Sequence, residues 1–405
     1  MSSETVLPET TTAAEAAGTA APVTKKGRER RIVVVYVIDN MRLGGTELNA
    51  VRTAERLDRE WFELRVVCLG EDGPLTERYR AMGVPVVNMP IRSFYGWSML
   101  RRGLQFVRYV HQARADIVHA HDVYSNIFAA VWARVAGVRV LVTSRRWWHS
   151  LPNWKLRRGS RFAFARANAV LANSPQVART VMEDGVPENR VWTITNFADD
   201  SAFGIASDAE RRALRLQWGA PNDATVIGCV ARMDPVKDHT GLLDAFARVH
   251  AKEPRVFLVL VGDGEMRPEL EAQVNAMSLA SVVHFTGELR DGSNYHRGFD
   301  ISALASRSEG FPNTLVEAMA AGRPVVATAV GGSIDAVAHE KTGLLVPPAD
   351  STALAEALLR LVEDEAAREK LGRQALQRAL DQYQAQRVVG SLADMYRELL
   401  VVRSS

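Results

Sequence analysis

The sequence has no long apolar run, few cysteines and little net charge. Its densest apolar stretches, 32–38 and 256–261, have the length of strands, whereas a membrane-spanning helix needs about 18 or more apolar residues. Its two cysteines, Cys68 and Cys229, each lie in an apolar run. We therefore expect buried thiols, no disulfide framework and a reducing cytoplasm. The N-terminus lacks the apolar segment of a secretory signal.

The charge balance and the missing motifs exclude further classes of protein. Fifty basic and 47 acidic residues leave a formal net charge of +3, which is too small to indicate a nucleic-acid partner. The sequence contains neither G-x-G-x-x-G nor G-x-x-x-x-G-K-[ST], so a dinucleotide fingerprint and a P-loop are unsupported. No third ligand is suitably spaced from His119 and His121 to favour a zinc site, and we expect no metal.

Short apolar runs alternate with helical patterns along most of the chain, which predicts parallel sheets covered on both faces. The rhythm is interrupted by the polar segment 198–223 and then restarts. We therefore predict an α/β fold of two doubly wound Rossmann-like domains that face each other across a cleft. The expected parts are a disordered tail (1–30), an N-terminal domain (31–200), a C-terminal domain (201–385) and a C-terminal helix (386–405) that packs back toward the N-terminal domain. The end of the chain, 375–402, is predicted as one long helix.

Ligands of such sheets bind beyond the carboxyl ends of the strands, so residues just after the strands are the candidates for function. Gly44 and Gly45 follow the first strand and open a helix, where free N–H groups favour phosphate. His119 and His121 alternate onto one face of the strand at 116–121. His121 is nearer the strand end and better placed to polarise a substrate, while His119 is expected to be structural.

The second half of the chain offers cations and carboxylates at its strand ends. Arg232 and Lys237 follow the strand at 225–231, and such a pair could stabilise a diphosphate leaving group. The stretch SEGFPNTLVE carries Glu309 before a turn and Glu317 inside a helix that we expect to begin near Leu315. Backbone N–H groups at this helix start are phosphate candidates, and capping by side chains is expected here; the residues are Asn313, Thr314 and Leu315.

Taken together, these motifs resemble one family. Glu309 to Glu317 is similar to the E-x7-E motif of retaining GT-B glycosyltransferases of family 4 (glycosyl transferases group 1). Arg232 with Lys237, Gly44-Gly45, the HAHD strand end and GGSIDAV at 331–337 match the same family in the same order. The resemblance covers about residues 31–400. Asp335 departs from it, since the related pattern often has Glu at this peripheral position.

The resemblance implies a role for each matched residue. Arg232 and Lys237 would neutralise the donor diphosphate in place of a metal. Glu309 would hold hydroxyls of the transferred sugar, and Glu317 the ribose of the nucleotide. Gly45 would approach the diphosphate, and His121 would contribute to transition-state stabilisation. The N-terminal domain would bind the acceptor, the C-terminal domain the nucleotide sugar, and the reaction would need no cofactor; UDP-linked donors are expected ahead of GDP-linked ones.

The segment 144–167 mixes basic residues with tryptophans. Nucleic acid, an anionic membrane surface and a solvated helix with packed aromatics are all open interpretations. Membrane docking would suit a lipid-linked or glycan acceptor in surface polysaccharide or glycolipid synthesis, with the protein peripheral on the inner face of the cell membrane. The membrane or acceptor candidates are Arg145, Arg146, Trp147, Trp148, Trp154, Arg157 and Arg158.

Two other functions fit the same frame: a nucleotide-sugar epimerase and a non-catalytic protein that binds sugar nucleotides. An epimerase would need acid and base carboxylates in a different pattern. The joint presence of His121, Arg232, Lys237, Glu309 and Glu317 argues against a non-catalytic copy.

Overall fold

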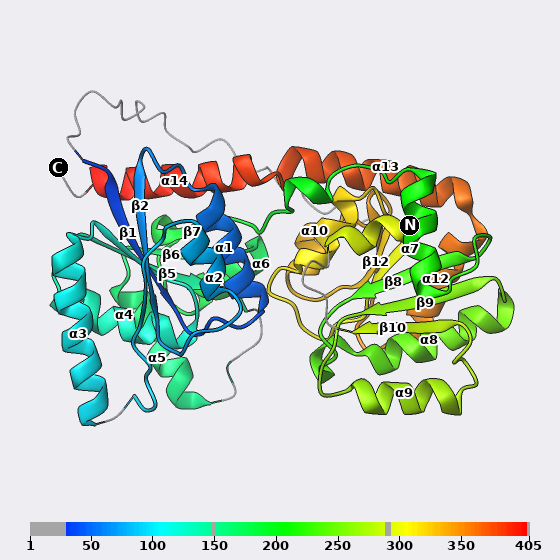
Figure 1. Ribbon diagram of the computed structural model, residues 1–405, viewed down its shortest axis with the longest axis horizontal. Coiled ribbons are helices and arrows are strands. Elements are labelled where there is room, and N and C mark those ends of the chain that lie inside the picture. The colour runs from blue at the N-terminus through cyan, green and yellow to red at the C-terminus, as the bar shows by residue number, and fades with distance from the viewer. Residues whose placement is uncertain (1–29, 95, 148–150, 152, 288–292, 403–405) are drawn as a thin grey trace, which may run out of the picture.

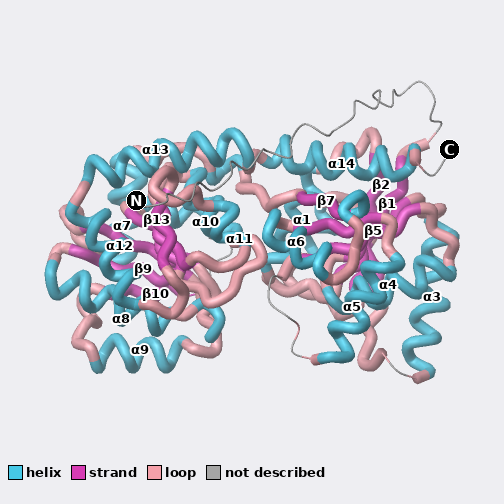
Figure 2. The backbone as a smooth tube through the Cα atoms, turned by 180° about the vertical axis from the view of Figure 1, so that it is seen from behind, coloured by secondary structure: helices cyan, strands magenta, loops and turns pink. Residues whose placement is uncertain are grey.

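The protein consists of two parallel β-sheets, each with helices on both faces, joined by a crossing of the chain (Figures 1 and 2). The computed structural model describes residues 30–94, 96–147, 151, 153–287 and 293–402. The predicted fold of two doubly wound α/β domains is confirmed. Among the described residues, no helix is both long and apolar enough to cross a membrane.

The first sheet has seven parallel strands in the order β3-β2-β1-β4-β5-β6-β7. Every residue of β1 is buried, as expected for an apolar strand covered on both faces. The strands are β1 (Ile32–Ile38), β2 (Phe62–Cys68), β3 (Val86–Asn88), β4 (Ile117–Ala120), β5 (Val140–Arg145), β6 (Ala169–Ala172) and β7 (Val191–Thr193).

Six helices within the first domain connect these strands. The helices α1 and α2 contribute to the core on one face of the sheet, and α3, α4 and α5 contribute to the core on the other. The helices are α1 (Gly45–Arg56), α2 (Thr76–Ala81), α3 (Trp97–Ala113), α4 (Val123–Val135), α5 (Trp154–Arg166) and α6 (Pro175–Glu183), and a short 3-10 turn, η2 (Glu188–Arg190), precedes β7.

The second sheet has six parallel strands in the order β10-β9-β8-β11-β12-β13. The strands are β8 (Thr225–Val230), β9 (Val256–Val261), β10 (Val283–Gly287), β11 (Ile301–Leu304), β12 (Val325–Thr328) and β13 (Gly343–Val346). The helices of this half are α7 (Asp208–Trp218), α8 (His239–Lys252), α9 (Arg267–Ala276), α10 (Asn313–Ala320), α11 (Gly332–Ala336), α12 (Ser351–Glu363) and α13 (Glu365–Gln382), with the 3-10 turns η3 (Asp200–Ala202), η4 (Pro235–Lys237) and η5 (Ser293–Gly298).

Both sheets reverse their strand order at one point, and this point positions the site. In the first sheet β1 lies beside β4, and in the second β8 lies beside β11. The chain leaves neighbouring strands in opposite directions at such a point, which opens a crevice at their carboxyl ends. The segments after β1, β4, β8 and β11 therefore carry the residues available to a ligand.

The C-terminal end is two helices rather than the single long helix predicted from the sequence. Helix α13 ends at Gln382, and α14 (Ala385–Val401) begins after a break at which Gln384 pairs with Ala198. Helix α13 lies along the second domain, whereas α14 crosses back over the first (Figure 1). Its apolar side joins the core of the first sheet through residues such as Val388, Leu392 and Tyr396. Because of this break, the C-terminal helices of the chain pack on both domains.

The N-terminal tail, residues 1–29, lies outside the described residues. Arg30, which we assigned to that tail, instead donates to both carboxylate oxygens of Asp116 at 2.9 Å. Asp116 also accepts the backbone N–H of Val33 at 2.9 Å. Arg30 therefore belongs to the described part of the first domain.

Candidate active site between the two domains

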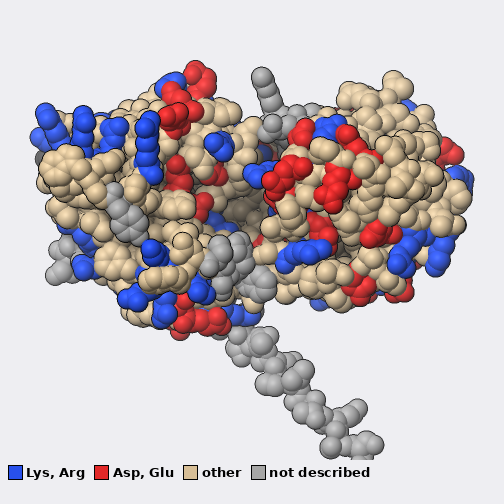
Figure 3. All heavy atoms as spheres, turned by 90° about the horizontal axis from the view of Figure 1, so that it is seen from below, with Lys and Arg blue, Asp and Glu red and all other residues tan. Residues whose placement is uncertain are grey.

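A cavity of about 380 Å³ lies between the carboxyl ends of the two sheets, and Figure 3 shows the molecule hollowed between its two lobes. Both domains contribute to its wall. The lining residues from the first domain and the crossing are Leu43, Gly44, Gly45, Thr46, Arg146, Asn173 and Asn196. Those from the second domain are Val230, Ala231, Arg232, Asp234, Lys237, Glu309, Gly310, Phe311, Pro312, Asn313 and Thr314.

The two glycines of the first domain lie where the sequence predicts them, at the start of α1. Gly44 is the N-cap residue and makes no side-chain cap, but the Glu47 carboxylate of the first turn folds back beside it, since a Cβ on Gly44 would overlap Glu47 Oε2. A Cβ atom on Gly45 would meet nothing within 4 Å. The backbone of Gly45 and Thr46 lines the cavity, and with the helix dipole it borders a space that a phosphate could occupy.

Arg146 adds a cation to the same wall. Its Nη1 donates to Asn49 Oδ1 at 2.8 Å and to Asn196 Oδ1 at 3.2 Å. Burial lowers the pKa of its guanidinium, although arginine stays charged at neutral pH. Asn196 in turn donates to Phe311 O at 3.1 Å and to Asn313 Oδ1 at 2.6 Å. A chain of hydrogen bonds thus links the first domain to the start of α10.

In the second domain, Lys237 and Glu309 are in direct contact. Lys237 Nζ lies 2.6 Å from Glu309 Oε1, which also accepts from Ser306 Oγ at 2.6 Å. Glu309 is only 8% exposed, so its carboxylate is held by these two donors. The Arg232 side chain is 69% exposed and lies 3.6 Å from Asp234 Oδ2. Arg232 is therefore the more exposed cation, and Lys237 is held by its short contact with Glu309.

The start of α10 differs from the expectation. The helix begins at Asn313 rather than near Leu315, its N-cap residue is Pro312, and no side chain caps it. Asn313 and Thr314 occupy the first turn and line the cavity. Leu315 is buried, and its N–H bonds to Pro312 O at 3.2 Å. Leu315 is therefore not placed to donate to a ligand as we predicted, because its N–H is already engaged.

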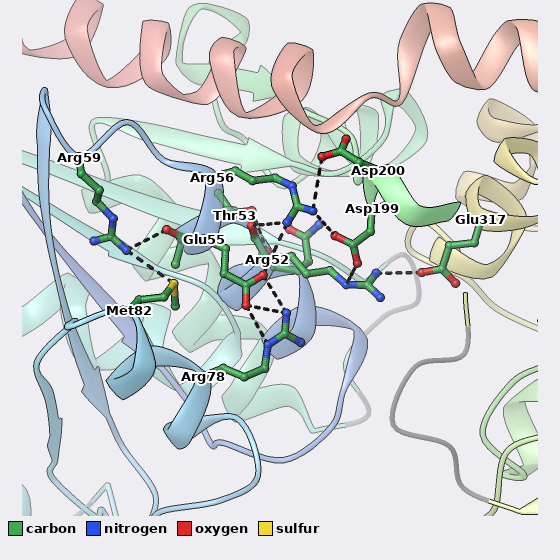
Figure 4. Close-up of polar contacts among 12 residues, drawn as sticks. Arg52, Thr53, Glu55, Arg56, Arg59, Arg78, Met82, Asp199, Asp200 and Glu317 are labelled. Carbon is green, nitrogen blue, oxygen red and sulfur yellow. Dashed lines mark hydrogen bonds and ion pairs between the residues drawn. The ribbon is translucent and has the colours of Figure 1, made fainter. Parts of the chain in front are cut away.

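Glu317 does not line the cavity; it is bound by the other domain (Figure 4). Arg52 of α1 donates from Nη1 to Glu317 Oε1 at 2.8 Å, and its Nε lies 2.7 Å from Asp199 Oδ2. The Arg52 and Glu317 side chains are 6% and 7% exposed. The carboxylate predicted to hold a ribose thus forms part of a buried ion pair across the domain interface.

His119 of β4 and His121, just after the strand, lie on the same side, as predicted, and their rings stack with centroids 4.2 Å apart. His119 bonds through its ring nitrogens to Tyr396 OH at 2.6 Å and Ser144 Oγ at 2.7 Å, which is a structural role. His121 is 1% exposed, and neither ring nitrogen has a hydrogen-bond partner among the described residues. Burial, then the neighbouring His119 and Arg146, hold the pKa of His121 well below its usual range, so it is neutral.

Partly buried carboxylates lie at the same strand ends. Asp39 follows β1 and accepts the backbone N–H groups of Tyr124 at 3.1 Å and Ser125 at 2.6 Å. Burial, together with the neighbouring charge of Asp122, raises the pKa of Asp39 to about 7. Asp122 itself caps α4. No group of three or more His, Cys, Asp or Glu residues in the described part of the chain is arranged to hold a metal ion.

The basic, aromatic segment divides into an inner and an outer part. Arg145 is 6% exposed, with Nη1 2.5 Å from Asp184 Oδ2. Arg146 lines the central cavity, and Trp147 packs against the core under α5. These three cannot reach a membrane, which corrects that part of the prediction. Trp154, Arg157 and Arg158 are exposed on α5, and Trp148 lies outside the described residues.

Two polar residues of the cavity, Asn173 and Asn196, and one of the domain interface, Arg52, were not predicted from the sequence. Asn173 and Asn196 come just after β6 and β7, so the strand-end rule that nominated Gly44 and Arg232 would also have nominated them. Arg52 lies in the middle of a helix, and no local signal distinguishes it.

Comparison with known proteins identifies related sequences for both halves. Residues 43–202 match the family model described as Glycosyltransferase Family 4, and residues 210–378 match that described as Glycosyl transferases group 1. The chain is 30% identical over 382 residues to the putative glycosyltransferase EpsF of Bacillus subtilis, covering 90% of this chain and 96% of that protein. It is 32% identical over 255 residues to the D-inositol 3-phosphate glycosyltransferase of Saccharomonospora viridis, covering 60% and 58%.

Solved structures share the fold. The crystal structure of Anabaena Alr3699/HepE in complex with UDP-glucose has a TM-score of 0.79 and 24% identity, covering 91% of this chain and 100% of that chain. Sucrose-phosphate synthase from Thermosynechococcus elongatus has a TM-score of 0.77 and 20% identity, covering 92% and 100%.

Proposed function

Because this chain belongs to glycosyltransferase family 4 and is a glycosyltransferase of the GT-B fold, we propose that it transfers a sugar from a nucleoside-diphosphate sugar with retention of the anomeric configuration. The observation that carries the proposal is the shared cavity, on which Arg232, Lys237 and Glu309 of one domain meet Gly44 and Gly45 of the other. UDP is the first candidate nucleotide, since structures that share this fold hold UDP or UDP-glucose.

The cavity supplies the charge that a departing diphosphate needs. Positive side chains and the first turns of α1 and α10 surround one space, and donors aimed at developing charge stabilise a transition state without reorganising. We propose that Arg232 and Lys237 serve here instead of a metal ion. With Glu309 held between Lys237 and Ser306, its remaining lone pairs are available to hydroxyls of the transferred sugar.

Retention follows if the acceptor attacks from the face that the diphosphate leaves. The bond from the anomeric carbon to the diphosphate oxygen breaks, and the bond to the acceptor oxygen forms. The acceptor proton passes to the leaving phosphate. His121 is neutral and has no hydrogen-bond partner among the described residues, so a short movement of the buried ring would let it bind a sugar hydroxyl.

The experiment is to incubate the protein with a panel of nucleotide sugars and to follow slow hydrolysis of the donor. NMR of the released sugar gives its anomeric configuration, and inversion would contradict the proposal. We expect Lys237→Ala and Glu309→Gln to lose nearly all activity, while Lys252→Ala, a change at an exposed residue at the end of α8, keeps it. Hydrolysis of no donor, or wild-type rates in both site variants, would refute the assignment.

We further propose that the acceptor is glycan or lipid-linked and that the protein docks on the inner, anionic face of the cell membrane. Helices α3 and α5 flank α4, whose Trp132 packs on Gly103 of α3, and the two helices project from the first domain in Figure 1. Lys and Arg side chains are prominent on that domain in Figure 3. Exposed tryptophans beside cations are typical of interfacial binding.

The exposed face of α3 was not part of the sequence prediction and supports the docking proposal. Trp97 is 79% and Leu104 55% exposed, and Arg101 and Arg108 lie on the same helical face by their spacing. Trp154 of α5 is 57% exposed. We expect Trp97→Ser/Leu104→Ser to weaken flotation with phosphatidylglycerol vesicles while donor hydrolysis is unchanged. Equal flotation of the variant and the wild type would remove the docking proposal.

A further inference from the structure

A second cavity, of about 330 Å³, lies in the first domain between α5, the segment after β5 and the end of α6. None of the described residues lines both this cavity and the central one. Its volume falls in the range of small-ligand pockets, about 300–1,000 Å³. The lining residues are Arg145, Trp147, Leu151, Trp154, Arg157, Arg158, Ser160, Arg161, Phe164 and Asp184.

The charge of this cavity is not balanced. Arg145 is neutralised by Asp184, the acidic lining residue. Arg157, Arg158 and Arg161 form no ion pair with any described residue. Arg158 lies over the Trp154 ring, with its Cζ 5.9 Å from the ring centroid. Three exposed cations on one helix thus line this cavity, and guanidinium groups in such a cluster favour binding of an anion such as phosphate.

A buried hydroxyl in the wall also has no partner. Ser160 is 4% exposed, and its Oγ has no hydrogen-bond partner among the described residues. A serine inside a helix usually bonds to a carbonyl of the preceding turn, and leaving a buried hydroxyl unpaired costs about 1–3 kcal/mol. Because Ser160 lines the cavity, a rotation about its χ1 bond would bring the hydroxyl to a ligand oxygen. This observation is independent of the arginines.

We propose that this cavity binds a phosphate group of the acceptor, with the guanidinium groups of Arg157, Arg158 and Arg161 and the Ser160 hydroxyl as donors. Guanidinium groups match phosphate in planar, two-point hydrogen bonds. The tryptophans of the wall offer faces for the sugar or lipid attached to the phosphate. That the phosphate belongs to the acceptor rests on the proposed function, whereas phosphate binding in this cavity does not.

The two cavities are adjacent through β5. Arg145 lines the second cavity and Arg146 lines the first, and successive side chains of an extended strand point to opposite sides. Their Cα atoms are about 3.8 Å apart. The two cavities therefore lie on opposite sides of the backbone at the end of β5, and an acceptor held by its phosphate at α5 would extend around this segment toward the central cavity.

The test measures binding of inorganic phosphate and of octyl phosphate by calorimetry, with octyl glucoside as the uncharged control. The full chain carries Arg232→Ala/Lys237→Ala, so that the central cavity has lost its exposed arginine and the lysine that contacts Glu309. We expect both phosphates to bind, and Arg157→Gln/Arg161→Gln added to this protein to weaken binding at least about tenfold. The matched control is Arg166→Gln, an exposed arginine of the same helix that packs on Phe162 and lies outside the cavity.

Each outcome decides the proposal. Octyl phosphate binding that depends on Arg157 and Arg161 but not Arg166 supports it, and Ser160→Ala should then weaken binding further. If phosphatidylglycerol vesicles compete with inorganic phosphate at the same residues, a lipid headgroup is the source of the phosphate. If they do not compete, the source is a phosphorylated acceptor. Loss of binding in the Arg232→Ala/Lys237→Ala protein, or equal losses from the Arg166 change, would overturn it; donor hydrolysis by wild type tests the proposed function separately.

Discussion

The ion pair between Arg52 and Glu317 makes a quantitative prediction about the domain interface. Both side chains are nearly buried, and the pair joins α1 of the first domain to α10 of the second. Arg52→Ala leaves Glu317 in a place from which water is excluded, without its cation. Breaking a buried ion pair from one side costs about 3–5 kcal/mol. Asp199, which also pairs with Arg52, keeps a cationic partner in this variant, because Arg56 Nη2 lies 2.7 Å from its Oδ1.

Two further variants separate this effect from a general loss of arginine. Arg56→Ala removes a cation that is 24% exposed and pairs with Asp199, and a partly exposed pair contributes about 0–1 kcal/mol. The double variant Arg52→Ala/Glu317→Gln removes the uncompensated charge together with its partner. We therefore expect stability to rank as Arg56→Ala above the double variant, and the double variant above Arg52→Ala.

The assay is urea unfolding followed by tryptophan fluorescence and circular dichroism. With an m-value of about 3 kcal/mol per M, a loss of 3–5 kcal/mol lowers the midpoint by at least about 1 M. The reasoning would be refuted by an Arg52→Ala midpoint no lower than that of Arg56→Ala. It would also be refuted if Glu317→Gln failed to restore stability in the Arg52→Ala background.

Two more predictions concern the cleft, one for Gly310 and one for Asp39. A Cβ on Gly310 would overlap the Arg146 carbonyl oxygen of the other domain, so we expect Gly310→Ala to weaken donor binding severalfold when binding is measured by calorimetry. The control is Gly390→Ala, whose Cβ meets nothing within 4 Å and which should bind the donor as wild type does. Equal affinities of the two variants would count against the close approach at Gly310. Because the pKa of Asp39 is raised from 3.8 to about 7, the folded protein holds its proton more tightly than the unfolded chain, and the associated stability, full below about pH 4, is lost as pH rises through 7. The melting temperature of Asp39→Asn minus that of wild type should therefore be higher at pH 8 than at pH 4.5. An equal difference at the two pH values would contradict the pKa shift.

The sequence alone determined the elements and their order. Continuous apolar strands such as β1 and β9 are readable because a strand covered on both faces must be apolar throughout. Since parallel strands bring their carboxyl ends to one edge, the strand-end rule also found Gly44, Arg232 and Glu309, and these do line one cavity. It did not predict the break between α13 and α14, because the residues around Gln384 include no glycine or proline to mark it.

Only the tertiary structure decided which side chains face one another. Glu317 pairs with Arg52 from 265 positions away, and no local pattern encodes a contact between residues of two domains. Adjacent arginines, Arg145 and Arg146, look alike in sequence but enter different cavities, because a strand turns successive side chains to opposite sides. The stretch that links Glu309 to Glu317 was visible as a motif. The packing of the two domains decided their partners: Glu309 pairs with Lys237 of its own domain, and Glu317 pairs with Arg52 of the other.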